Sequence, residues 1–552
     1  MTPDRTTTSD RKTILEIRDL QITLPKGGDR PHALWDFNLS VAEGEIVCLV
    51  GESGSGKSLA ASAAMRLLPE PHVHVSKGEI RLDGTNLLAL SEPQMRAMRG
   101  DRMAMIFQEP MTALNPQKTV GWQIDEVLRL HTKLDRAARK ARALEILTDV
   151  HIPDPASTYN AYPHQISGGQ RQRVMIAMAL VLRPRLIIAD EPTTALDVTT
   201  QKQILKLIKE LQAAQGTGIL FITHDFGVVA EIADRIAVLR LGEMVEQGPA
   251  AQILGNPQHP YTRKLIAAVP SLRPPPEKPL STEPVVLEAR GLRKTFGARG
   301  GLLGGKRAPV VAVRDLSFQL RRGETLGVVG ESGSGKTTVS RIVTRLLAAD
   351  AGEVRIHDGD LLSATRAELR ALRKDIQMVF QDPMASLNPR RRVVDLIAQG
   401  PIVQGVARET ALARARELLE LVELPAAAAN RYPHEFSGGQ RQRIGIARAL
   451  AMEPRVIVAD EPVSALDVSV QAQVLRLLAD LRDRLHLSLL FVTHDMRVAA
   501  QLCDKVIVMS KGEIVEAGPS ARVFADPQHP YTRTLLESIP GRSWEPPVHS
   551  LA

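Results

Sequence analysis

The chain has 552 residues, more than one hydrophobic core usually holds, so several domains are expected. Hydrophobic residues make up 44% and charged residues 24%, as in ordinary globular proteins. No apolar run approaches the length that spans a bilayer, and the polar first residues predict no signal peptide. The formal net charge of +8 is spread along the chain, and it permits a polyanion or an acidic membrane surface as a neighbour without requiring either.

The chain contains two cysteines, Cys48 and Cys503. Both lie in apolar surroundings, and neither has a Cys or His partner at metal-ligand spacing. They are expected to be small buried apolar side chains in a reducing cytosol.

In chain order, residues 14–50 are expected to form strands, and a helix is expected over residues 59–68. Between them lies a segment that fits the phosphate-loop pattern G-x-x-x-x-G-K-[ST]. Its glycines allow the backbone N–H groups to converge on phosphate, its lysine adds positive charge, and its last hydroxyl can reach Mg²⁺. The segment consists of Gly51, Glu52, Ser53, Gly54, Ser55, Gly56, Lys57 and Ser58.

The middle of this half predicts capped helices and a sheet. Residues 91–94 have the composition of a capping box, and residues 122–158 have helical periodicity without a strand signal. Residues 186–240 alternate short apolar runs with helices, as an α/β sheet requires. The apolar run 186–189 ends in Asp190 and Glu191, of which the first suits Mg²⁺ and the second can accept a proton from attacking water.

These motifs occur a second time. A second phosphate loop consists of Gly330, Glu331, Ser332, Gly333, Ser334, Gly335, Lys336, Thr337 and Thr338. Asp460 and Glu461 repeat the acidic pair 270 residues further on, and residues 365–368 repeat the capping box. The repeat predicts a duplicated domain at 13–269 and 285–540. Residues 270–284, with six prolines in 15 residues, are expected to form an extended linker.

Each half also carries a Ser-Gly-Gly-Gln segment followed by Arg-Gln-Arg, and here the sequence resembles the ATP-binding cassette (ABC) family. The resemblance covers residues 13–535 and implies two tandem P-loop ATPase domains of the α/β class. Each has a RecA-like core, an antiparallel β subdomain and a helical subdomain. The signature residues are Ser167, Gly168, Gly169 and Gln170 in the first half and Ser437, Gly438, Gly439 and Gln440 in the second.

The resemblance further implies two head-to-tail ATP sites, in which the signature of one domain faces the phosphate loop of the other. Gln108 and Gln381 match the glutamine loop that touches Mg²⁺, and Asp197 and Asp467 match the inter-domain loop. One site joins Lys57, Ser58, Gln108, Asp190, Glu191 and His224 to the second signature; the other joins Lys336, Thr337, Gln381, Asp460, Glu461 and His494 to the first. His224 and His494 match the histidine that contacts the γ-phosphate. Because both sets are complete, both sites are expected to hydrolyse ATP.

The halves differ where the family stacks adenine on an aromatic ring. The second half offers Phe296, and the first offers Leu24. This difference predicts weaker nucleotide binding at the first site, by up to ~1–3 kcal/mol. The alternative is that both side chains belong to the core.

Residues 108–116, 381–389, 257–262 and 527–532 resemble the peptide/nickel/opine importer branch. The implied function is ATP-driven uptake of di- or oligopeptides, with glutathione, antibiotic-like peptides, opines or nickel as alternative cargo. The implied partners are two integral-membrane permeases and, indirectly, an extracytoplasmic solute-binding protein, with no nucleic acid. The chain is then expected at the cytoplasmic face of the inner membrane. It lacks the four-cysteine motif of many relatives, so no iron–sulfur cluster is expected.

Three rival functions explain less of the sequence. A soluble tandem cassette acting on ribosomes or nucleic acid usually has a long charged linker, zinc-binding inserts or coiled coils. An exporter ATPase does not account for the importer-type segments, and a P-loop kinase or GTPase does not account for Ser-Gly-Gly-Gln.

Overall fold

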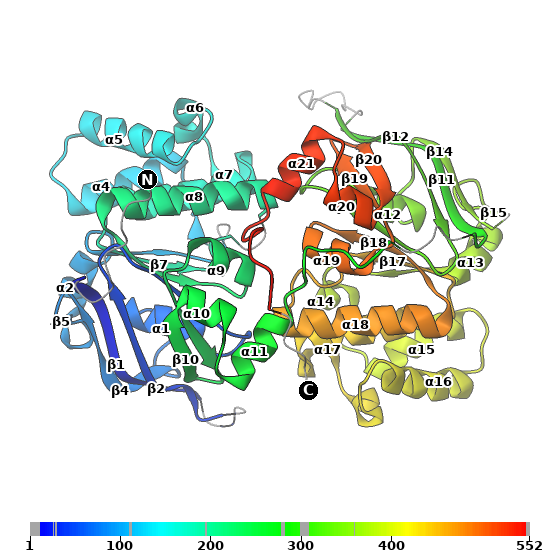
Figure 1. Cartoon of the computed structure of the whole chain (residues 1–552), viewed down its shortest axis with the longest axis horizontal. Coiled ribbons are helices and arrows are strands. Elements are labelled where there is room, and N and C mark those ends of the chain that lie inside the picture. The colour runs from blue at the N-terminus through cyan, green and yellow to red at the C-terminus, as the bar shows by residue number, and fades with distance from the viewer. Residues whose placement is uncertain are drawn as a thin grey trace. The chain divides into compact units, whose positions relative to one another are not determined.

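The computed structural model of the chain describes residues 11–25, 27, 30–109, 113–193, 196–277, 282–297, 309–357 and 359–547. Most of the polar start, most of the 297–306 loop and the last residues of the tail lie outside the described residues. The chain divides into two compact units, one mainly within residues 1–267 and the other mainly within residues 268–545 (Figure 1).

The first unit contains an antiparallel sheet with the strand order β2-β1-β4-β5. Its strands are β1 (Thr13–Thr23), β2 (His32–Ala42), β4 (His74–Leu82) and β5 (Thr85–Asn86). Buried and exposed residues alternate along much of β1 and β2, as expected for strands with one face on a core.

A second sheet of the first unit has the order β10-β9-β3-β8-β7-β6. All five residues of β3, β7 and β8 are buried, which explains their continuous apolar sequences, and these strands pair in parallel. The strands are β3 (Ile46–Val50), β6 (Met103–Ile106), β7 (Leu186–Asp190), β8 (Gly218–Ile222), β9 (Arg235–Arg240) and β10 (Glu243–Pro249).

Helices complete the first unit, and the helical segment expected at 122–158 is confirmed. Thr119, Asp135 and Asp154 cap its three helices by accepting hydrogen bonds from backbone N–H groups. The α-helices are α1 (Lys57–Ala64), α2 (Glu92–Met98), α4 (Val120–His131), α5 (Arg136–Asp149), α6 (Pro155–Asn160), α7 (Gly168–Leu180), α8 (Val198–Gln215), α9 (Phe226–Ile232), α10 (Ala250–Gly255) and α11 (Pro260–Ala267). The first of these ends four residues before the expected residue 68.

The second unit repeats both sheets, in the orders β12-β11-β14-β15 and β16-β17-β18-β13-β19-β20. The strands are β11 (Val285–Phe296), β12 (Val310–Arg321), β13 (Thr325–Val329), β14 (Ala351–Ile356), β15 (Gly359–Asp360), β16 (Ile376–Val379), β17 (Val456–Asp460), β18 (Ser488–Thr493), β19 (Lys505–Ser510) and β20 (Glu513–Pro519). The helices are α12 (Lys336–Val343), α13 (Arg366–Asp375), α14 (Pro383–Ser386), α15 (Val393–Val403), α16 (Arg408–Leu421), α17 (Gly438–Leu450), α18 (Val468–Leu485), α19 (Met496–Leu502), α20 (Ser520–Ala525) and α21 (Pro530–Glu537).

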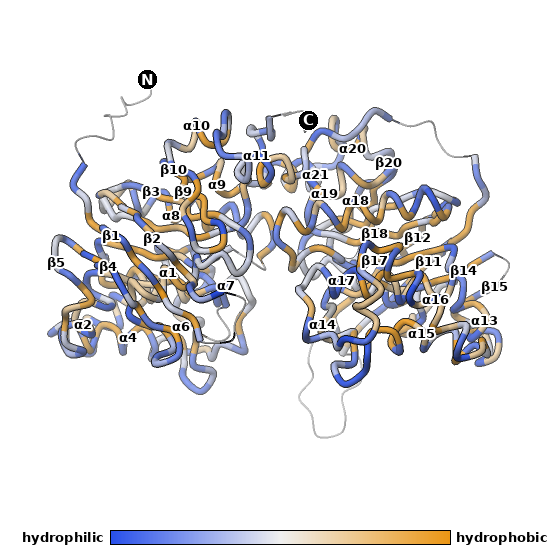
Figure 2. The backbone as a smooth tube through the Cα atoms, turned by 90° about the horizontal axis from the view of Figure 1, so that it is seen from below, coloured by the Kyte–Doolittle hydropathy of each residue, from blue (hydrophilic) through white to orange (hydrophobic). Residues whose placement is uncertain are grey.

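The layers of the second unit follow from the alternation of side chains along its parallel strands. Leu490 and Val492 of β18 share a core with α12 and the antiparallel sheet, whereas Leu489 and Phe491 share another core with α17, α18 and α19. Helix α12 therefore packs between the two sheets, and α17, α18 and α19 cover the opposite face. In both units, apolar stretches run through the sheets, while many outer loops are polar (Figure 2).

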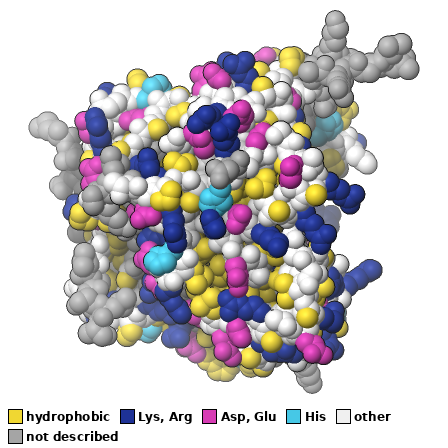
Figure 3. Space-filling model, turned by 90° about the vertical axis from the view of Figure 1, so that its right-hand side faces the viewer, with side chains coloured by type: hydrophobic (Ala, Val, Ile, Leu, Met, Phe, Trp, Pro, Cys, Tyr) yellow, Lys and Arg dark blue, Asp and Glu magenta, His cyan; other side chains and the backbone are white. Residues whose placement is uncertain are grey.

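Several local expectations are confirmed. The Ser91–Gln94 and Thr365–Glu368 capping boxes both form. Cys48 and Cys503 are buried, and burial raises the pKa of both thiols. The spread of charge is visible on one face of the second unit, where cationic and anionic side chains are interspersed (Figure 3). Among the described residues, no helix is long and apolar enough to cross a membrane.

Candidate active site

The first phosphate loop connects β3 to α1, and its glycines are required by the geometry. Gly51 and Gly56 have φ angles of 155° and 112°. A Cβ atom at Gly51 would lie 2.2 Å from the carbonyl oxygen of Leu239, and one at Gly56 would lie 2.6 Å from that of Ala33. Only glycine fits such positions without moving the backbone.

The second loop connects β13 to α12 in the same way. Gly330 and Gly335 have φ angles of 147° and 108°, and a Cβ atom at either would lie 2.3 Å from a carbonyl oxygen, of Met509 and Ala312 respectively. Gly54 and Gly333 also have positive φ angles, but they are exposed and nothing crowds them.

The loop lysines start their helices and are almost fully buried, at 6% exposure for Lys57 and 4% for Lys336. Lys57 Nζ donates to the carbonyl oxygens of Gly51 and Glu52, at 2.7 and 2.9 Å. Lys336 Nζ donates to Gly330 and Glu331, at 2.8 Å each. Burial lowers the pKa of Lys336. Phosphate oxygens are stronger acceptors than these carbonyls, so both ammonium groups are placed for a polyphosphate.

Next to the loops, hydroxyls meet the carboxylates that end strands β7 and β17. Ser58 Oγ donates to Asp190 Oδ1 at 3.1 Å. Asp460 accepts from Thr337 Oγ1 at 3.5 Å and from Ser340 Oγ at 2.9 Å. Burial raises the pKa of both aspartates. Hydroxyl and carboxylate oxygens at the mouth of a phosphate loop are the donors that Mg²⁺ prefers, so this set fits the ion.

The residue after each aspartate carries the candidate general base. Glu191 and Glu461 both have a φ of 46°, in the left-handed region that is strained for glutamate and is often found at active sites. Their N–H groups donate across the sheet to Ile222 and Val492, at 2.9 and 2.8 Å, which holds the backbone in this conformation.

Each glutamate contacts the predicted histidine and glutamine of its own unit. Glu191 Oε1 lies 3.0 Å from His224 Nδ1, and its Oε2 accepts from Gln108 Nε2 at 3.0 Å. The structure thus brings together, within one unit, three residues that are up to 116 positions apart in the sequence.

The second unit repeats this arrangement. Glu461 Oε2 lies 3.3 Å from His494 Nδ1 and accepts from Gln381 Nε2 at 2.9 Å. Burial acts to raise the pKa of Glu461, but the hydrogen bond and charge of His494 outweigh it, and the pKa lies below its ordinary value. Burial acts to lower the pKa of His494, but Glu461 outweighs it, and that pKa is raised.

The signature segments form the N-termini of α7 and α17. Ser167 Oγ accepts from the N–H of Gln170, whose Oε1 accepts from the N–H of Ser167, so this serine and glutamine close a capping box. The same box forms in the second unit between Ser437 and Gln440. At Gly168, nothing lies within 4 Å of a Cβ position, so this helix end is open to a neighbouring group.

The remaining predicted residues lie at the edges of these units. Asp467 is the N-cap of α18, and Asp197 Oδ1 accepts from Thr199 Oγ1 at 2.6 Å at the start of α8. Phe296, at the end of β11, is 42% exposed, with Lys294 Nζ 5.7 Å from its ring centroid. Leu24 is half-buried and packs against the core of the first unit. The alternative that both side chains belong to the core is therefore wrong for Phe296.

Two contacts of the loops were missed by sequence reasoning. Tyr261 and Tyr531 lie against the second residue of each loop, although their segments served only to indicate the importer branch. The recurrence of a tyrosine after each loop, 209 residues beyond Glu52 and 200 residues beyond Glu331, is the one signal that could have suggested the contact. Ser340, one helical turn after the second loop, was also not predicted to contact Asp460.

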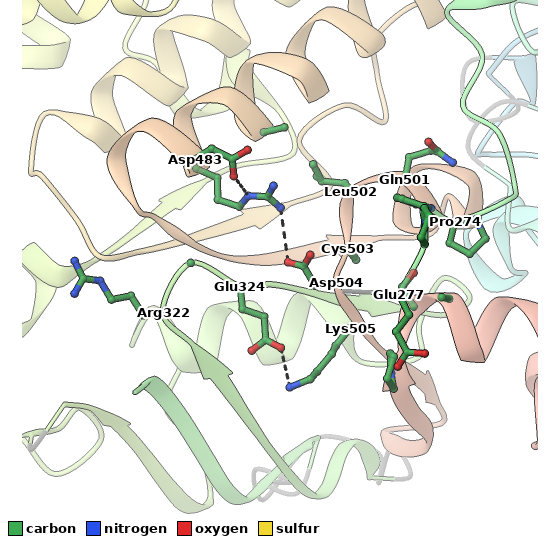
Figure 4. Close-up of a pocket in the computed structure, with 18 residues that line it drawn as sticks. Pro274, Glu277, Arg322, Glu324, Asp483, Gln501, Leu502, Cys503, Asp504 and Lys505 are labelled. Atoms are coloured by element: carbon green, nitrogen blue, oxygen red, sulfur yellow. Dashed lines mark hydrogen bonds and ion pairs between the residues drawn. The ribbon is translucent and has the colours of Figure 1, made fainter. Parts of the chain in front are cut away.

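A pocket in the second unit lies outside the predicted site residues (Figure 4). Residues 274–277 form one of its walls, and several of its charged groups are paired. Lys505 Nζ lies 2.8 Å from Glu324 Oε1, and Arg482 lies 2.8 Å from Asp483 and 3.7 Å from Asp504. Among the residues that the structure describes, no group of three or more His, Cys, Asp or Glu side chains is arranged to hold a metal ion.

Comparison with known families agrees with this geometry. The model of the ABC transporter family matches residues 34–194 and 313–464, so one match covers each phosphate loop, signature and acidic pair. The chain belongs to the ABC transporter family. A model of the C-terminal region of oligopeptide/dipeptide transporters matches residues 245–299 and 515–545, after each cassette. The protein is thus an ABC transporter ATPase with two cassettes, each followed by this region.

Curated relatives align with nearly the whole length of this chain. The peptidoglycan transport ATP-binding protein YejF of Agrobacterium fabrum is 47% identical over 525 residues, which are 95% of this chain and 96% of the relative. The glutathione import ATP-binding protein GsiA of Escherichia coli K12 is 48% identical over 562 aligned residues, covering 96% of this chain and 90% of the relative. A solved ATP-binding cassette dimer, bound to ADP and Pi, is 30% identical with a TM-score of 0.38, covering 42% of this chain and 98% of that one.

Proposed function

We propose that this ABC ATPase energises the uptake of peptides across the cytoplasmic membrane through two partner permeases. The observation that carries the proposal is that in each cassette a glutamate contacts a glutamine and a histidine, and that a match to the oligopeptide/dipeptide C-terminal region follows. The relatives' names suggest peptide-containing cargo, since glutathione is a tripeptide and peptidoglycan contains peptide stems. Dipeptides and oligopeptides are therefore the first candidates, with opines and nickel as alternatives.

In the proposed reaction, each glutamate accepts the proton of the water that attacks the γ-phosphate. His224 and His494 hold the glutamates and contact the same phosphate, while Lys57 and Lys336 bind its oxygens. Bound Mg²⁺ would be held by Ser58 and Asp190, or by Thr337 and Asp460, with Gln108 or Gln381, and it would neutralise charge on the phosphates. The protein needs no covalent intermediate, because positioning and charge account for phosphoryl transfer to water.

We further propose that each signature segment completes the ATP site of the other cassette, in a head-to-tail pair. Both segments form a helix N-terminus, which suits contact with phosphate oxygens, and in the first of them Gly168 leaves the helix end open. Joining both cassettes in one chain gives each an effective concentration of roughly millimolar for the other. The proposed cassette domains are residues 13–269 and 285–540, with 270–284 as the linker. Closure on ATP and reopening after hydrolysis would move the permeases.

The experiment that tests this function is a pull-down of the tagged chain from detergent-solubilised membranes of its own host. Recovery of two polytopic permeases, in amounts equal to the ATPase, supports the importer. The solute-binding protein that accompanies those permeases would then be titrated with dipeptides, glutathione, opines and nickel. Recovery of ribosomes or nucleic acid without a permease would overturn the proposal. An untagged chain is the matched control for nonspecific capture.

A further inference from the structure

The tyrosine of each Gln-His-Pro-Tyr-Thr segment contacts the phosphate loop of its own cassette. Tyr261, in α11, accepts a hydrogen bond from the N–H of Glu52 at 3.4 Å across 209 residues of sequence. Tyr531, in α21, accepts from the N–H of Glu331 at 3.4 Å and donates to Glu331 Oε2 at 3.2 Å. The contact occurs in both cassettes, so it is a repeated feature of the architecture.

The rest of each segment holds the tyrosine in place. In the second cassette, the N–H of Tyr531 donates to His529 Nδ1 at 3.1 Å. The N–H groups of Gln528 and His529 donate to the two oxygens of Glu516, in β20, at 2.8 and 3.1 Å. A bidentate carboxylate thus fixes the start of α21 on the strand before it.

The first cassette has the same contacts. The N–H of Tyr261 donates to His259 Nδ1 at 3.1 Å, and Glu246, in β10, accepts from Gln258 and His259 at 2.7 and 3.1 Å. Each glutamine and histidine therefore serves to orient the tyrosine that follows.

The hydroxyls remain protonated at any ordinary pH. Burial raises the pKa of Tyr261 and of Tyr531 to about 12, and the negative charges of Glu52 and Glu331 act in the same direction. A neutral phenol can accept from the loop N–H and donate to the carboxylate at once. Each hydroxyl therefore engages both the backbone and the side chain of one loop residue.

Glu52 and Glu331 each place a carboxylate in a loop that is proposed to bind a triphosphate. Two anions in a partly buried site repel each other strongly. We propose that Tyr261 and Tyr531 are positioning residues of the two phosphate loops. Each hydroxyl fixes the loop glutamate by its N–H and its carboxylate, so that the carboxylate cannot turn toward the phosphates. The C-terminal region after each cassette thereby becomes part of its ATP site.

The test is Tyr531→Phe in the full chain, which keeps the ring and removes the hydroxyl. It is made in a Lys57→Ala background so that the second loop dominates nucleotide binding. The Kd for a nonhydrolysable ATP analogue with Mg²⁺ should rise roughly 3- to 10-fold, the scale of one lost hydrogen bond, with a smaller change in kcat. Tyr261→Phe in a Lys336→Ala background should have the same effect. Tyr159→Phe, in α6 of the helical segment, is the matched control and should leave the Kd unchanged.

A second substitution separates positioning from simple packing. If the tyrosine acts by restraining the glutamate charge, Glu331→Gln added to Tyr531→Phe should restore most of the lost affinity, because a neutral amide does not repel phosphate. An unchanged Kd in Tyr531→Phe would overturn the proposal. A weakened Kd that Glu331→Gln fails to restore, in a protein with unchanged thermal unfolding, would also overturn it.

Discussion

The two cassettes agree at the atoms to which hydrolysis is assigned in the proposed reaction, and they differ in what surrounds these atoms. The contact between the glutamine and the candidate general base measures 3.0 Å in the first cassette and 2.9 Å in the second. The contact between glutamate and histidine measures 3.0 and 3.3 Å. Both glutamates share the same strained φ of 46°. The agreement indicates that the cassette fold determines the conformation and contacts of this glutamate, whichever half of the chain the cassette occupies.

The surroundings differ after the histidine. In the second cassette, Arg497 is only 6% exposed and donates to the carbonyl oxygen of Gly541 at 2.8 Å and to that of Pro270 at 3.5 Å. The corresponding residue of α9, 270 positions earlier, is Gly227, which has no side chain to make such contacts. Helix α19 is thus fastened to the start of the linker and to the tail, whereas α9 has no equivalent arginine.

A neighbouring residue strengthens this difference. Gln501 Nε2 donates to the carbonyl oxygens of Ser271 and Arg273, at 2.9 and 2.7 Å, and Ser271 Oγ donates to Glu545 at 2.7 Å. The residues before the proline run are therefore part of the second unit. The contacts of the candidate general base thus occur in both cassettes, whereas Arg497 and Gln501 join the second cassette to the linker and the tail.

The largest predicted effect tests the shared part of the comparison. Glu191→Gln together with Glu461→Gln should lower ATP turnover by roughly 10²–10⁴, the scale of a lost general base. Each single substitution should also lower the steady-state rate, because both cassettes are equipped alike. Steady-state phosphate release checks this. Unchanged hydrolysis in the double variant would refute the role, and a single variant with the full rate would show that its cassette is idle.

The next prediction concerns the hydrogen bonds of Arg497, whose counterpart in the first cassette is Gly227. Arg497→Ala removes the hydrogen bonds of a buried guanidinium group to Gly541 and Pro270, and it should lower the free energy of unfolding of the second unit by about 2–4 kcal/mol. The measurement is urea unfolding followed by Trp544 fluorescence, in a chain where the exposed Trp35 and Trp122 are changed to Phe. Arg522→Ala, an exposed arginine of α20, is the control and should change little. Equal stability of the two variants would show that the fastening contributes nothing.

A smaller effect is expected from the aromatic difference. The exposed ring of Phe296 is available for stacking, whereas Leu24 packs against its core. ATP should therefore bind more weakly at the first site, by up to ~1–3 kcal/mol. Titration of Lys57→Ala and Lys336→Ala chains compares the two sites. Phe296→Ala should remove the difference, while Val310→Ala on the paired strand should preserve it. Comparable affinities in the two starting chains would contradict the prediction.

The smallest effect is a pH dependence of the second unit. The raised pKa of His494 means that its contact with Glu461 stabilises the fold fully below about pH 6.5 and is lost as the pH rises through the higher folded value. The lowered pKa of Glu461 means that the same contact is lost only in acid. Because His494 is partly exposed, the change between pH 6 and pH 9 should be about 1 kcal/mol or less. Trp544 unfolding curves measure it, and Glu461→Gln should remove it.

The sequence predicted the fold and most of the site, because phosphate binding depends on local patterns. A glycine loop between a strand and a helix, or an acidic pair that ends a buried strand, can be recognised from about ten consecutive residues. Contacts made by tertiary packing are harder to predict, because their partners lie far apart along the chain. The tyrosines reach the loops across about 200 residues, and Arg497 is recognisable only when its partners in the linker and tail are known.

The exposure of the Leu24 and Phe296 side chains was harder to predict than their places at the ends of the strands. Leu24 and Phe296 align at the ends of corresponding strands, and the pattern alone allowed both to be core. Their difference depends on how each strand end packs, since β11 ends in an exposed ring beside Lys294 while Leu24 folds back on apolar neighbours. The loops between these strand ends and the next strands differ in length and composition, so the repeat itself could not supply the answer.

Two competent ATP sites in one chain are the main feature of the proposed function. Its most direct measurement is the number of ATP molecules trapped per chain by the Glu191→Gln/Glu461→Gln variant, incubated with ATP and Mg²⁺ and then separated from free nucleotide. Two competent sites predict two ATP per chain, and this number should fall to one when Lys57→Ala or Lys336→Ala is added. A value of one before either lysine is changed would contradict it and would leave a single working cassette.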